Sequence, residues 1–395
     1  MFSYVFSLVF TVLILVATVF VAYSGLLFFA GLSYKSKLRK SNKTPKISVV
    51  VAAKNESKYI GNLLSGLVKQ DYPEDKYEVI VAEDGSTDST REIAKSWSLK
   101  YPSKIKLVCS SDSDGKPAAL NRALGLASGE IIGQIDADSS VGEDLLRSVA
   151  LAFEDDVVAI QGQSSVENSD QNLLSKVTAY EQEVWNRYSI QGRARLNLFV
   201  PCLGNLSFVR RSVLDEISGW DTSALAEDIE LSLQMWLKGY KFEYRPEVKC
   251  NEVTVSKLSS FYKQRLRWYG GYIQSLIRHG NLLRKINAQA IDGEILLSGP
   301  LTGIMGLLIL VLGLTAFALG VNTVQLISWA PYTLGSYTIF SSVATFAAVR
   351  YEKARKPWKL IPAVYFYWFL ESVVSVVALL KVLFKRKITW TRTEK

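Results

Sequence analysis

The eight residues Ile131-Ile132-Gly133-Gln134-Ile135-Asp136-Ala137-Asp138 decide how the middle of this chain folds. The first five form a short isoleucine-rich run, which is typical of a buried strand. Two carboxylates follow at alternate positions, and alternate side chains of an extended segment point to the same side. The sequence therefore predicts a strand whose end presents Asp136 and Asp138 together, as oxygen ligands for a hard divalent cation. A solvated turn is the alternative, because Asp-x-Asp is common in loops.

This strand belongs to a series in which short β-branched runs alternate with helical patterns. The alternation predicts an α/β fold with a largely parallel sheet and helices on its faces. The predicted strands are 47–53, 77–82, 105–108, 131–135 and 157–161. The predicted helices are 56–69, 88–95, 117–127, 142–153, 173–191 and 228–238.

Polar residues follow three of the predicted strands. Asn55 and Glu56 come after the first strand, Asp84 after the second, and Asp136 after the fourth. Sheets of this class bind ligands beyond the carboxyl ends of their strands, so we expect these side chains to converge on one crevice.

Asp84 lies in the segment Glu83-Asp84-Gly85-Ser86-Thr87-Asp88. Gly85 allows the backbone to approach a ligand closely. Asp84 is therefore a candidate for a contact to a nucleoside base or ribose. Asp88 is better placed to cap the helix that follows.

Two further charged segments are candidates for chemistry. Lys116 precedes a predicted helix, where a cation and backbone N–H groups hold phosphate, although a solvated lysine is the alternative. Glu227 and Asp228 open another helix, where acidic residues also complement the helix dipole. Asp228 is a candidate base for an acceptor hydroxyl.

The string Gln264-Arg265-Leu266-Arg267-Trp268 is the least ordinary in the chain. Gln264, Arg267 and Trp268 share one helical face by their i, i+3, i+4 spacing. Arginine suits bidentate phosphate contact, and an indole offers a flat face to a sugar ring. The same pattern is typical of an interfacial amphipathic helix, and we expect both properties here.

The N-terminal segment has the features of a membrane-spanning helix. Residues 1–34 carry no charge, and 5–32 exceed the about 20 residues that cross a bilayer. Six lysines and arginines follow within 35–46, whereas a cleavable signal peptide carries its charge before the apolar core. The positive-inside rule then places the middle of the chain in the cytoplasm.

The C-terminal region is also apolar. Candidate spans are 295–320, 326–349 and 360–384. Three spans would place the basic tail 387–395 outside, against the positive-inside rule. Either 360–384 is re-entrant or interfacial, or the tail departs from the rule.

Composition excludes several classes of site. The net charge of +9 lies largely beside apolar segments, which favours a topology signal and membrane lipids over nucleic acid as a partner. The three cysteines are odd in number and lack metal-ligand spacing, which argues against a disulfide framework. A single histidine argues against a His-ligated zinc site and a Ser-His-Asp triad.

The ordered set of Asp84, Asp136-Ala-Asp138, Glu227-Asp228 and Gln264 to Trp268 resembles membrane-integrated family 2 glycosyltransferases, the group that includes cellulose, chitin, hyaluronan and poly-N-acetylglucosamine synthases. The resemblance covers about 46–272 and the flanking membrane layout. It implies a GT-A-like nucleotide-sugar-binding domain inserted between transmembrane helices. The implied reaction is inverting β-glycosyl transfer from a UDP-sugar to a growing polysaccharide at the cell membrane, with Mg²⁺ or Mn²⁺.

The resemblance also implies roles for individual residues. Asp228 would be the catalytic base, and Asp136 and Asp138 would serve the metal. The nucleotide-sugar would contact Asn55, Glu56, Asp84, Lys116, Asp136 and Arg267. The acceptor would contact Gly204, Asn205, Glu227, Gln264 and Trp268. Ala226 stands where many relatives have threonine, which weakens a close subfamily assignment.

Two other functions stay open on these residues. One is transfer of a single sugar to a lipid acceptor, ceramide-like or polyprenyl phosphate. The other is a small transporter or membrane scaffold, in which the carboxylates and the Gln264 to Trp268 string would have no function.

The sequence predicts six parts of the chain. They are a transmembrane helix 1–34, a basic linker 35–46, a cytoplasmic catalytic domain 47–257, interfacial helices 258–290 with the Gln264 to Trp268 string, a transmembrane region 291–386 and a basic tail 387–395.

Overall fold

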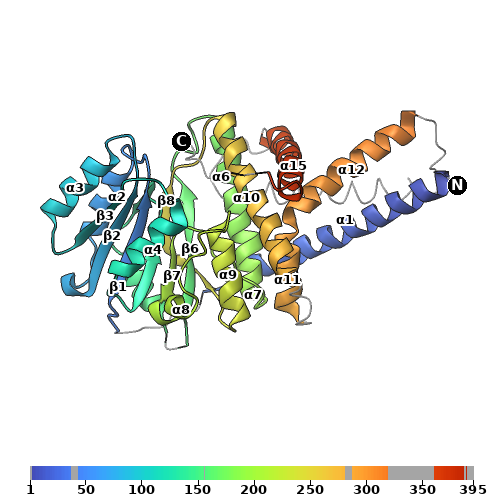
Figure 1. The fold of residues 1–395 in the computed structure, drawn as a ribbon. Coiled ribbons are helices and arrows are strands. Elements are labelled where there is room, and N and C mark those ends of the chain that lie inside the picture. The colour runs from blue at the N-terminus through green and yellow to red at the C-terminus, as the bar shows by residue number, and fades with distance from the viewer. Residues whose placement is uncertain are drawn as a thin grey trace. The chain divides into compact units, whose positions relative to one another are not determined.

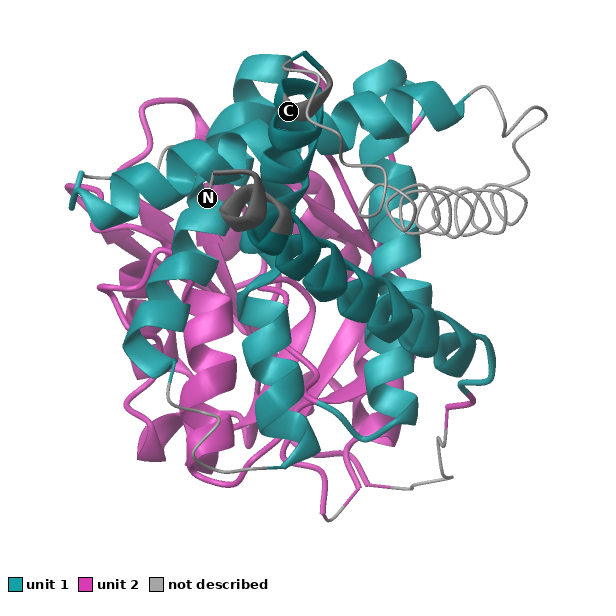
Figure 2. Ribbon diagram, turned by 90° about the vertical axis from the view of Figure 1, so that its right-hand side faces the viewer, with its two compact units in different colours: residues 1–34, 170–198, 258–388 teal, residues 35–169, 199–257, 389–395 magenta. Residues whose placement is uncertain are grey.

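The computed structural model describes residues 2–36, 43–154, 156–280, 287–318, 360–386 and 388. They form two compact units (Figure 2). Unit 1 takes the described residues of 1–34, 170–198 and 258–388, and unit 2 those of 35–169 and 199–257. The segment 170–198, which the sequence places in the middle domain, therefore belongs to unit 1. The predicted domain boundaries stay predictions, and the span 326–349 and all of the tail except residue 388 lie outside the described residues.

Unit 2 is built on a mixed sheet with eight described strands in the order β3-β2-β1-β4-β7-β6-β8-β5 (Figure 1). β1 pairs in parallel with β2 and β4, and β2 pairs in parallel with β3. β7 is antiparallel to β4 and β6, and β5 is antiparallel to β8, which is parallel to β6. All described strands except β5 and β7 thus share one direction, which confirms the predicted largely parallel sheet. The strands are β1 (Ile47–Ala53), β2 (Tyr77–Asp84), β3 (Ile105–Ser110), β4 (Ile131–Gln134), β5 (Ser139–Val141), β6 (Ala159–Val166), β7 (Ser207–Arg210) and β8 (Glu243–Glu252).

The sequence missed β5, β7 and β8 for physical reasons. β5 and β7 are too short to show a period-2 pattern. β8 carries several charged residues and Pro246, which are depleted in strands. These strands acquire their extended form from pairing within the sheet.

Helices cover both faces of the sheet. Ile47, Val49 and Val51 alternate along β1 and pack in one buried cluster with Leu63 and Leu67 of α2. α3 and α5 contribute to the same cluster, whereas α4 packs against β1 and β2 on the opposite face (Figure 1). The helices of unit 2 are α2 (Ile60–Val68), α3 (Thr90–Lys100), α4 (Lys116–Leu126), α5 (Leu145–Ala152), α8 (Arg211–Glu216) and α9 (Glu227–Leu237), with a 3-10 turn at Glu74–Lys76.

Unit 1 is helical in its described residues. The predicted helix 173–191 is present but interrupted, since α6 passes through a π-helical segment (Trp185–Ile190) into α7. Gly192 of α7 lies against α1, and a Cβ there would come within 2.3 Å of the Leu27 carbonyl oxygen. The helices are α1 (Phe2–Leu32), α6 (Leu173–Val184), α7 (Gln191–Arg195), α10 (Leu258–His279), α11 (Ala288–Leu297), α12 (Gly299–Ala318) and α15 (Ile361–Leu383).

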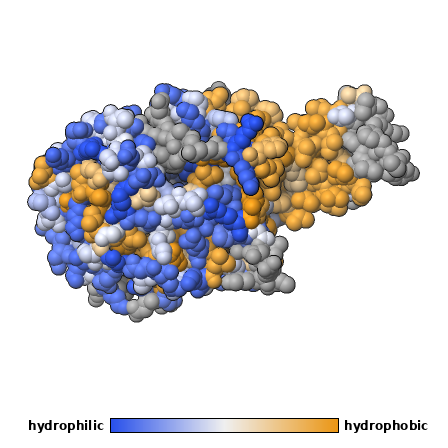
Figure 3. Space-filling model, in the orientation of Figure 1, coloured by the Kyte–Doolittle hydropathy of each residue, from blue (hydrophilic) through white to orange (hydrophobic). Residues whose placement is uncertain are grey.

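Two described helical segments, Leu8–Leu32 and Ile361–Leu383, are long and apolar enough to cross a membrane. They correspond to the predicted spans 5–32 and 360–384. The predicted span 295–320 is instead divided between α11 and α12, which meet at an angle of 58° and count as a third span only if they cross together. Hydrophobic residues gather over α1 and α12 (Figure 3).

Candidate active site

The ammonium group of Lys116 connects three segments of unit 2. Its Nζ lies 2.7 Å from Asp136 Oδ1 and 3.2 Å from Glu227 Oε1. It also donates to the carbonyl oxygen of Gly204 at 3.0 Å. Burial by itself lowers the pKa of Lys116, but Asp136 and Glu227 raise it above its ordinary value. Lys116 is therefore a charged group at neutral pH, between two carboxylates.

Gly204 brings the loop before β7 against Asp228. Its φ of +73° is a left-handed conformation, and a Cβ there would lie 2.8 Å from Asp228 Oδ2. Glycine avoids both the backbone strain and this close contact. The Gly204 carbonyl also accepts from Gln134 Nε2 at 2.6 Å, so Lys116 and Gln134 together fix this loop.

Asn205 connects the end of β4 to β8. Its Oδ1 accepts from the backbone N–H of Asp136 at 3.1 Å. Its Nδ2 donates to Ser139 Oγ at 3.0 Å and to Glu252 Oε2 at 2.6 Å. The buried amide of Asn205 thus holds the backbone that carries Asp136.

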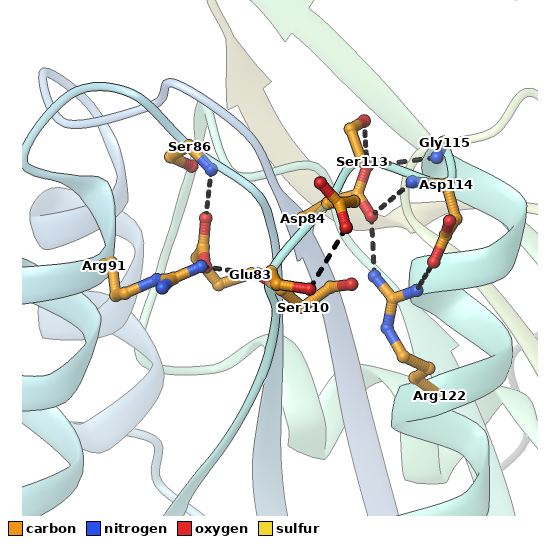
Figure 4. Close-up of polar contacts among 11 residues, drawn as sticks. Glu83, Asp84, Ser86, Arg91, Ser110, Ser113, Asp114, Gly115 and Arg122 are labelled. Carbon is orange, nitrogen blue, oxygen red and sulfur yellow. Dashed lines mark hydrogen bonds and ion pairs between the residues drawn. The ribbon is translucent and has the colours of Figure 1, made fainter.

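Asp84 is buried at the end of β2, where its carboxylate accepts four hydrogen bonds (Figure 4). Oδ1 accepts from Arg122 Nη2 at 2.6 Å and from the Asp114 N–H at 3.2 Å. Oδ2 accepts from Ser113 Oγ at 2.7 Å and from the Gly115 N–H at 3.1 Å. Burial raises the pKa of Asp84, but these donors outweigh it and lower the pKa below its ordinary value. Asp84 is therefore an ionised acceptor at neutral pH.

The neighbouring Glu83 faces the other side of the sheet. Its Oε2 lies 2.7 Å from Nε of Arg91, which comes from α3. Successive side chains of a strand point to opposite faces, so Arg91 of α3 and Arg122 of α4 neutralise adjacent carboxylates on opposite faces (Figure 4).

The loops after β1 and β2 are joined by hydrogen bonds. Asn55 has a φ of 56°, and its Oδ1 accepts from the Thr87 N–H at 2.7 Å. The Glu56 N–H donates to Thr90 Oγ1 at 2.7 Å. Asp88 Oδ1 accepts from the N–H of Thr90, the first residue of α3, at 3.0 Å, but the N-cap residue is Ser89, whose side chain makes no capping hydrogen bond.

Unit 2 thus brings the residues that follow β1, β2 and β4 into connected groups. The Asp84 network ends at Gly115, and the next residue, Lys116, begins the group that contains Asp136 and Glu227. Hydrogen bonds also join the segments after β1 and β2, but convergence of all three segments on one crevice stays a prediction. It is α4 that connects the two groups.

Asp136 and Asp138 have the ligand chemistry of a hard cation site. The Asp136 side chain is 34% exposed with its carboxylate beside Lys116, whereas Asp138 is buried. Among the described residues, no group of three or more His, Cys, Asp or Glu side chains is arranged to hold a metal ion. Two carboxylates alone do not close a coordination sphere, so these residues fit a cation that a ligand's phosphate oxygens also hold.

Gln264, Arg267 and Trp268 lie on α10 of unit 1, as predicted. Gln264 and Arg267 are half-buried and Trp268 is exposed, whereas Arg265 and Leu266 between them are buried. This burial pattern agrees with the shared helical face that their spacing predicts.

Two polar residues of unit 2 were missed by sequence reasoning. Arg122 pairs with Asp84 only because α4 packs beside β2, which local sequence does not specify. Gln134 is buried and accepts from the indole N–H of Trp220 at 3.1 Å. A glutamine inside the otherwise apolar run Ile131–Ile135 was a readable signal, because buried polar groups need partners.

Comparison with known proteins gives the class of this chain. The model of a family described as glycosyltransferase like family 2 matches residues 45–271, more than half of the sequence. The chain belongs to this family and is a glycosyltransferase.

The mannosyltransferase PcManGT from Pyrobaculum calidifontis, solved in complex with GDP-Man and Mn²⁺, is similar in structure with a TM-score of 0.62. It is 21% identical, and the match covers 97% of this chain and 99% of that one. The family match and this likeness confirm the predicted GT-A-like fold, with helices near both ends that are apolar enough to span a membrane.

Two relatives differ in the products that their names give. The β-monoglucosyldiacylglycerol synthase of Nostoc sp. is 32% identical over 268 residues, which is 66% of this chain and 56% of that protein. The poly-β-1,6-N-acetyl-D-glucosamine synthase of Staphylococcus epidermidis is 26% identical over 366 residues, 88% of this chain and 87% of that protein. The chain thus spans little more than half the length of the Nostoc relative.

The contact between Gly204 and Asp228 gives a prediction with an internal control. Gly204→Ala places a methyl group against Asp228 Oδ2, so the carboxylate must move, and misplacement of this kind costs about 10²-fold in turnover. Gly239→Ala carries the same type of strain, at a φ of +92°, with no atom within 4 Å of its Cβ. Each variant should lose about 1–2 kcal/mol of stability, but only Gly204→Ala should lose glycosyl transfer. Equal losses of turnover in both variants would contradict the prediction that the contact with Asp228 controls turnover.

Proposed function

We propose that this glycosyltransferase transfers a sugar from a UDP-sugar to a growing polysaccharide at the membrane, with inversion at the anomeric carbon. The observation that carries the proposed reaction is the gathering of Asp136, Glu227 and the Gly204 loop, beside Asp228, around one charged lysine. The choice of acceptor is supported by the Staphylococcus epidermidis relative, whose match extends over 88% of this chain.

On the donor side, the proposed site offers the carboxylate of Asp84 as a hydrogen-bond acceptor and the ammonium group of Lys116 as a positive charge. The ionised carboxylate of Asp84 suits an N–H or O–H donor of the nucleoside. Its oxygens already accept four hydrogen bonds, so a nucleoside would displace or share one of these donors. The charged ammonium of Lys116 suits a diphosphate oxygen, and Asn55 and Glu56 would complete the nucleotide contacts.

Asp136 and Asp138 are the residues that would hold Mg²⁺ or Mn²⁺. When bound, such a cation neutralises negative charge on the leaving nucleoside diphosphate. In the structure Asp136 is paired with Lys116, so Lys116 and a cation would share this carboxylate. Asn205 would keep the backbone of Asp136 in place as the ligands change.

Asp228 is the proposed base. It would remove the proton from an acceptor hydroxyl as the acceptor oxygen forms its bond to the anomeric carbon and the bond to the nucleoside diphosphate breaks. Its Oδ1 accepts from the N–H of Ile229 at 2.9 Å, which fixes one oxygen, whereas Oδ2 is the atom nearest to Gly204. Gly204, Asn205 and Glu227 would border the acceptor.

Three residues of α10 have proposed roles. Arg267 would contact the donor diphosphate, and Gln264 and Trp268 would line the acceptor entrance. We place the protein in the cell membrane. The basic segment 35–46 supports a catalytic domain on the cytoplasmic side, where the soluble donor is found.

A second candidate function is transfer of one sugar to a lipid. The observation that favours it is the 32% identity to the Nostoc protein, whose name gives a glucolipid, monoglucosyldiacylglycerol, as the product. The two functions differ in the length and solubility of the product.

One experiment separates these functions. The full chain in lipid nanodiscs would receive Mg²⁺ or Mn²⁺ and, in turn, radiolabelled UDP-glucose, UDP-N-acetylglucosamine and GDP-mannose, with diacylglycerol or N-acetylglucosamine oligosaccharides as acceptor. We expect a UDP-sugar to give water-soluble products of many lengths. A single glucolipid species would support the second function, and transfer only from GDP-mannose would contradict the proposed donor.

Removal of one predicted metal ligand tests the cation. Asp138→Asn should abolish most transfer and weaken Mn²⁺-dependent binding of UDP, because an amide is a poorer ligand for a hard cation than a carboxylate. UDP binding by calorimetry, with Mn²⁺ and with chelator, measures the effect without turnover. Asp215→Asn, on the surface of α8, is the control. Full transfer by wild-type protein in chelator would show that no cation is needed.

Removal of the proposed base separates catalysis from binding. Asp228→Asn should lower turnover by about 10²-fold or more, with donor affinity little changed. Initial rates at several donor concentrations give both turnover and donor affinity, and Asp215→Asn is again the control. If donor affinity falls as much as turnover, Asp228 has a structural role instead.

A further inference from the structure

Arg265, inside the string Gln264 to Trp268, is the buried arginine of this segment. Its side chain is 3% exposed, whereas Arg267 is half-buried. A buried guanidinium needs partners, and this one has two carboxylates from other helices of unit 1. Arg265 Nη2 lies 2.6 Å from Glu181 Oε2 of α6, and Nε lies 2.7 Å from Glu371 Oε1 of α15.

The same guanidinium lies over the ring of Trp268. Its Cζ is 4.3 Å from the indole centroid and 5.3 Å from the ring centroid of Phe261. Trp268 is one turn after Arg265 and Phe261 one turn before it, so both rings reach the guanidinium from the same helix. The indole is 37% exposed, with Arg265 as a buried contact beneath it.

The position of Arg265 is set by packing as well as by charge. Leu266 and Ile273 of α10 share a buried cluster with Val374 and Ala378 of α15. Arg265 also donates to the hydroxyl of Tyr367, again on α15. A helix that is apolar enough to cross a membrane thus fixes the guanidinium.

We propose that Arg265 is a positioning residue that holds the indole of Trp268 in the orientation used for the acceptor. Arg265 acts through Trp268, and Glu181 and Glu371 act through Arg265. Arginine is required because its planar fork meets two carboxylates and still presents a flat face to the indole. Lysine keeps the charge but cannot do both. This inference rests on the proposed acceptor contact of Trp268.

A double-mutant cycle tests the inference in the full chain in nanodiscs, with UDP-N-acetylglucosamine as donor and N-acetylglucosamine oligosaccharides as acceptor. Arg265→Lys should raise the acceptor KM about tenfold, the effect of a cation–π contact of intermediate strength. Donor hydrolysis without acceptor should stay within about twofold of wild type, because the metal and base residues are unchanged. In a Trp268→Ala background, Arg265→Lys should add less than about twofold, since the contact is already lost.

Arg193→Lys is a matched control for loss of a buried arginine. Arg193 of α7 is also buried, pairs with Asp292 of α11 at 3.1 Å and lies 5.6 Å from the ring of Trp185. The Arg193→Lys variant should lower the midpoint temperature of thermal unfolding, as Arg265→Lys does, and should leave the acceptor KM unchanged. If Arg265→Lys does not fold, Glu181→Gln carries the test, because it removes one partner of Arg265 at a side chain that is 31% exposed. The same rise in acceptor KM, absent in the Trp268→Ala background, is then expected.

An unchanged acceptor KM in Arg265→Lys, or a tenfold effect that persists without Trp268, overturns the inference. An equal rise in KM for Arg193→Lys does so as well, because general destabilisation would then explain both variants. Failure of the proposed function gives a different result: wild-type protein transfers no sugar to these acceptors, or Trp268→Ala transfers like wild type. Either outcome removes the acceptor role of Trp268 and the inference with it.

Discussion

The arrangement of the candidate site depends on the charge of Lys116. Its ammonium meets Asp136, Glu227 and the carbonyl oxygen of Gly204, which come from segments far apart in the sequence. Glu227 is buried, and a buried carboxylate without a nearby cation is costly, so loss of this charge would leave Glu227 uncompensated and repelled by Asp136. The lysine therefore holds together the segments that the proposed chemistry needs, before any ligand supplies charge of its own.

Helix α4 supplies the cations for both groups of acidic residues. Lys116 is its first residue, and Arg122 lies further along the same helix and neutralises Asp84. Packing α4 against β1 and β2 thus places one positive group at each acidic segment. The opposite face follows the same principle, because Arg91 of α3 neutralises Glu83. The alternation of side chains along β2 is what separates the two pairs.

Unit 1 uses buried arginines in a comparable way. Arg193 pairs with Asp292, and Arg265 pairs with Glu181 and Glu371, in each case between different helices. A buried ion pair contributes little net stability compared with apolar packing, but breaking one leaves an uncompensated charge. Such pairs therefore restrict how helices align. In unit 1 the Arg265 pairs connect α10 with α6 and with α15, which is apolar enough to span a membrane, and the Arg193 pair connects α7 with α11.

The sequence by itself determined the parallel core, the acidic ends of its strands, the helical face of Gln264 and Trp268, and two membrane-spanning candidates, because periodicity and local composition control these features. Tertiary structure decided the rest. The strands β5, β7 and β8 form by pairing, and the segment 170–198 joins unit 1 by packing. The pairing of Lys116 with Asp136, and the burial of Arg265 rather than Arg267, depend on which helix lies beside which. A charged side chain has the same local pattern whether water or a distant carboxylate solvates it, so only the packed fold fixes its partner.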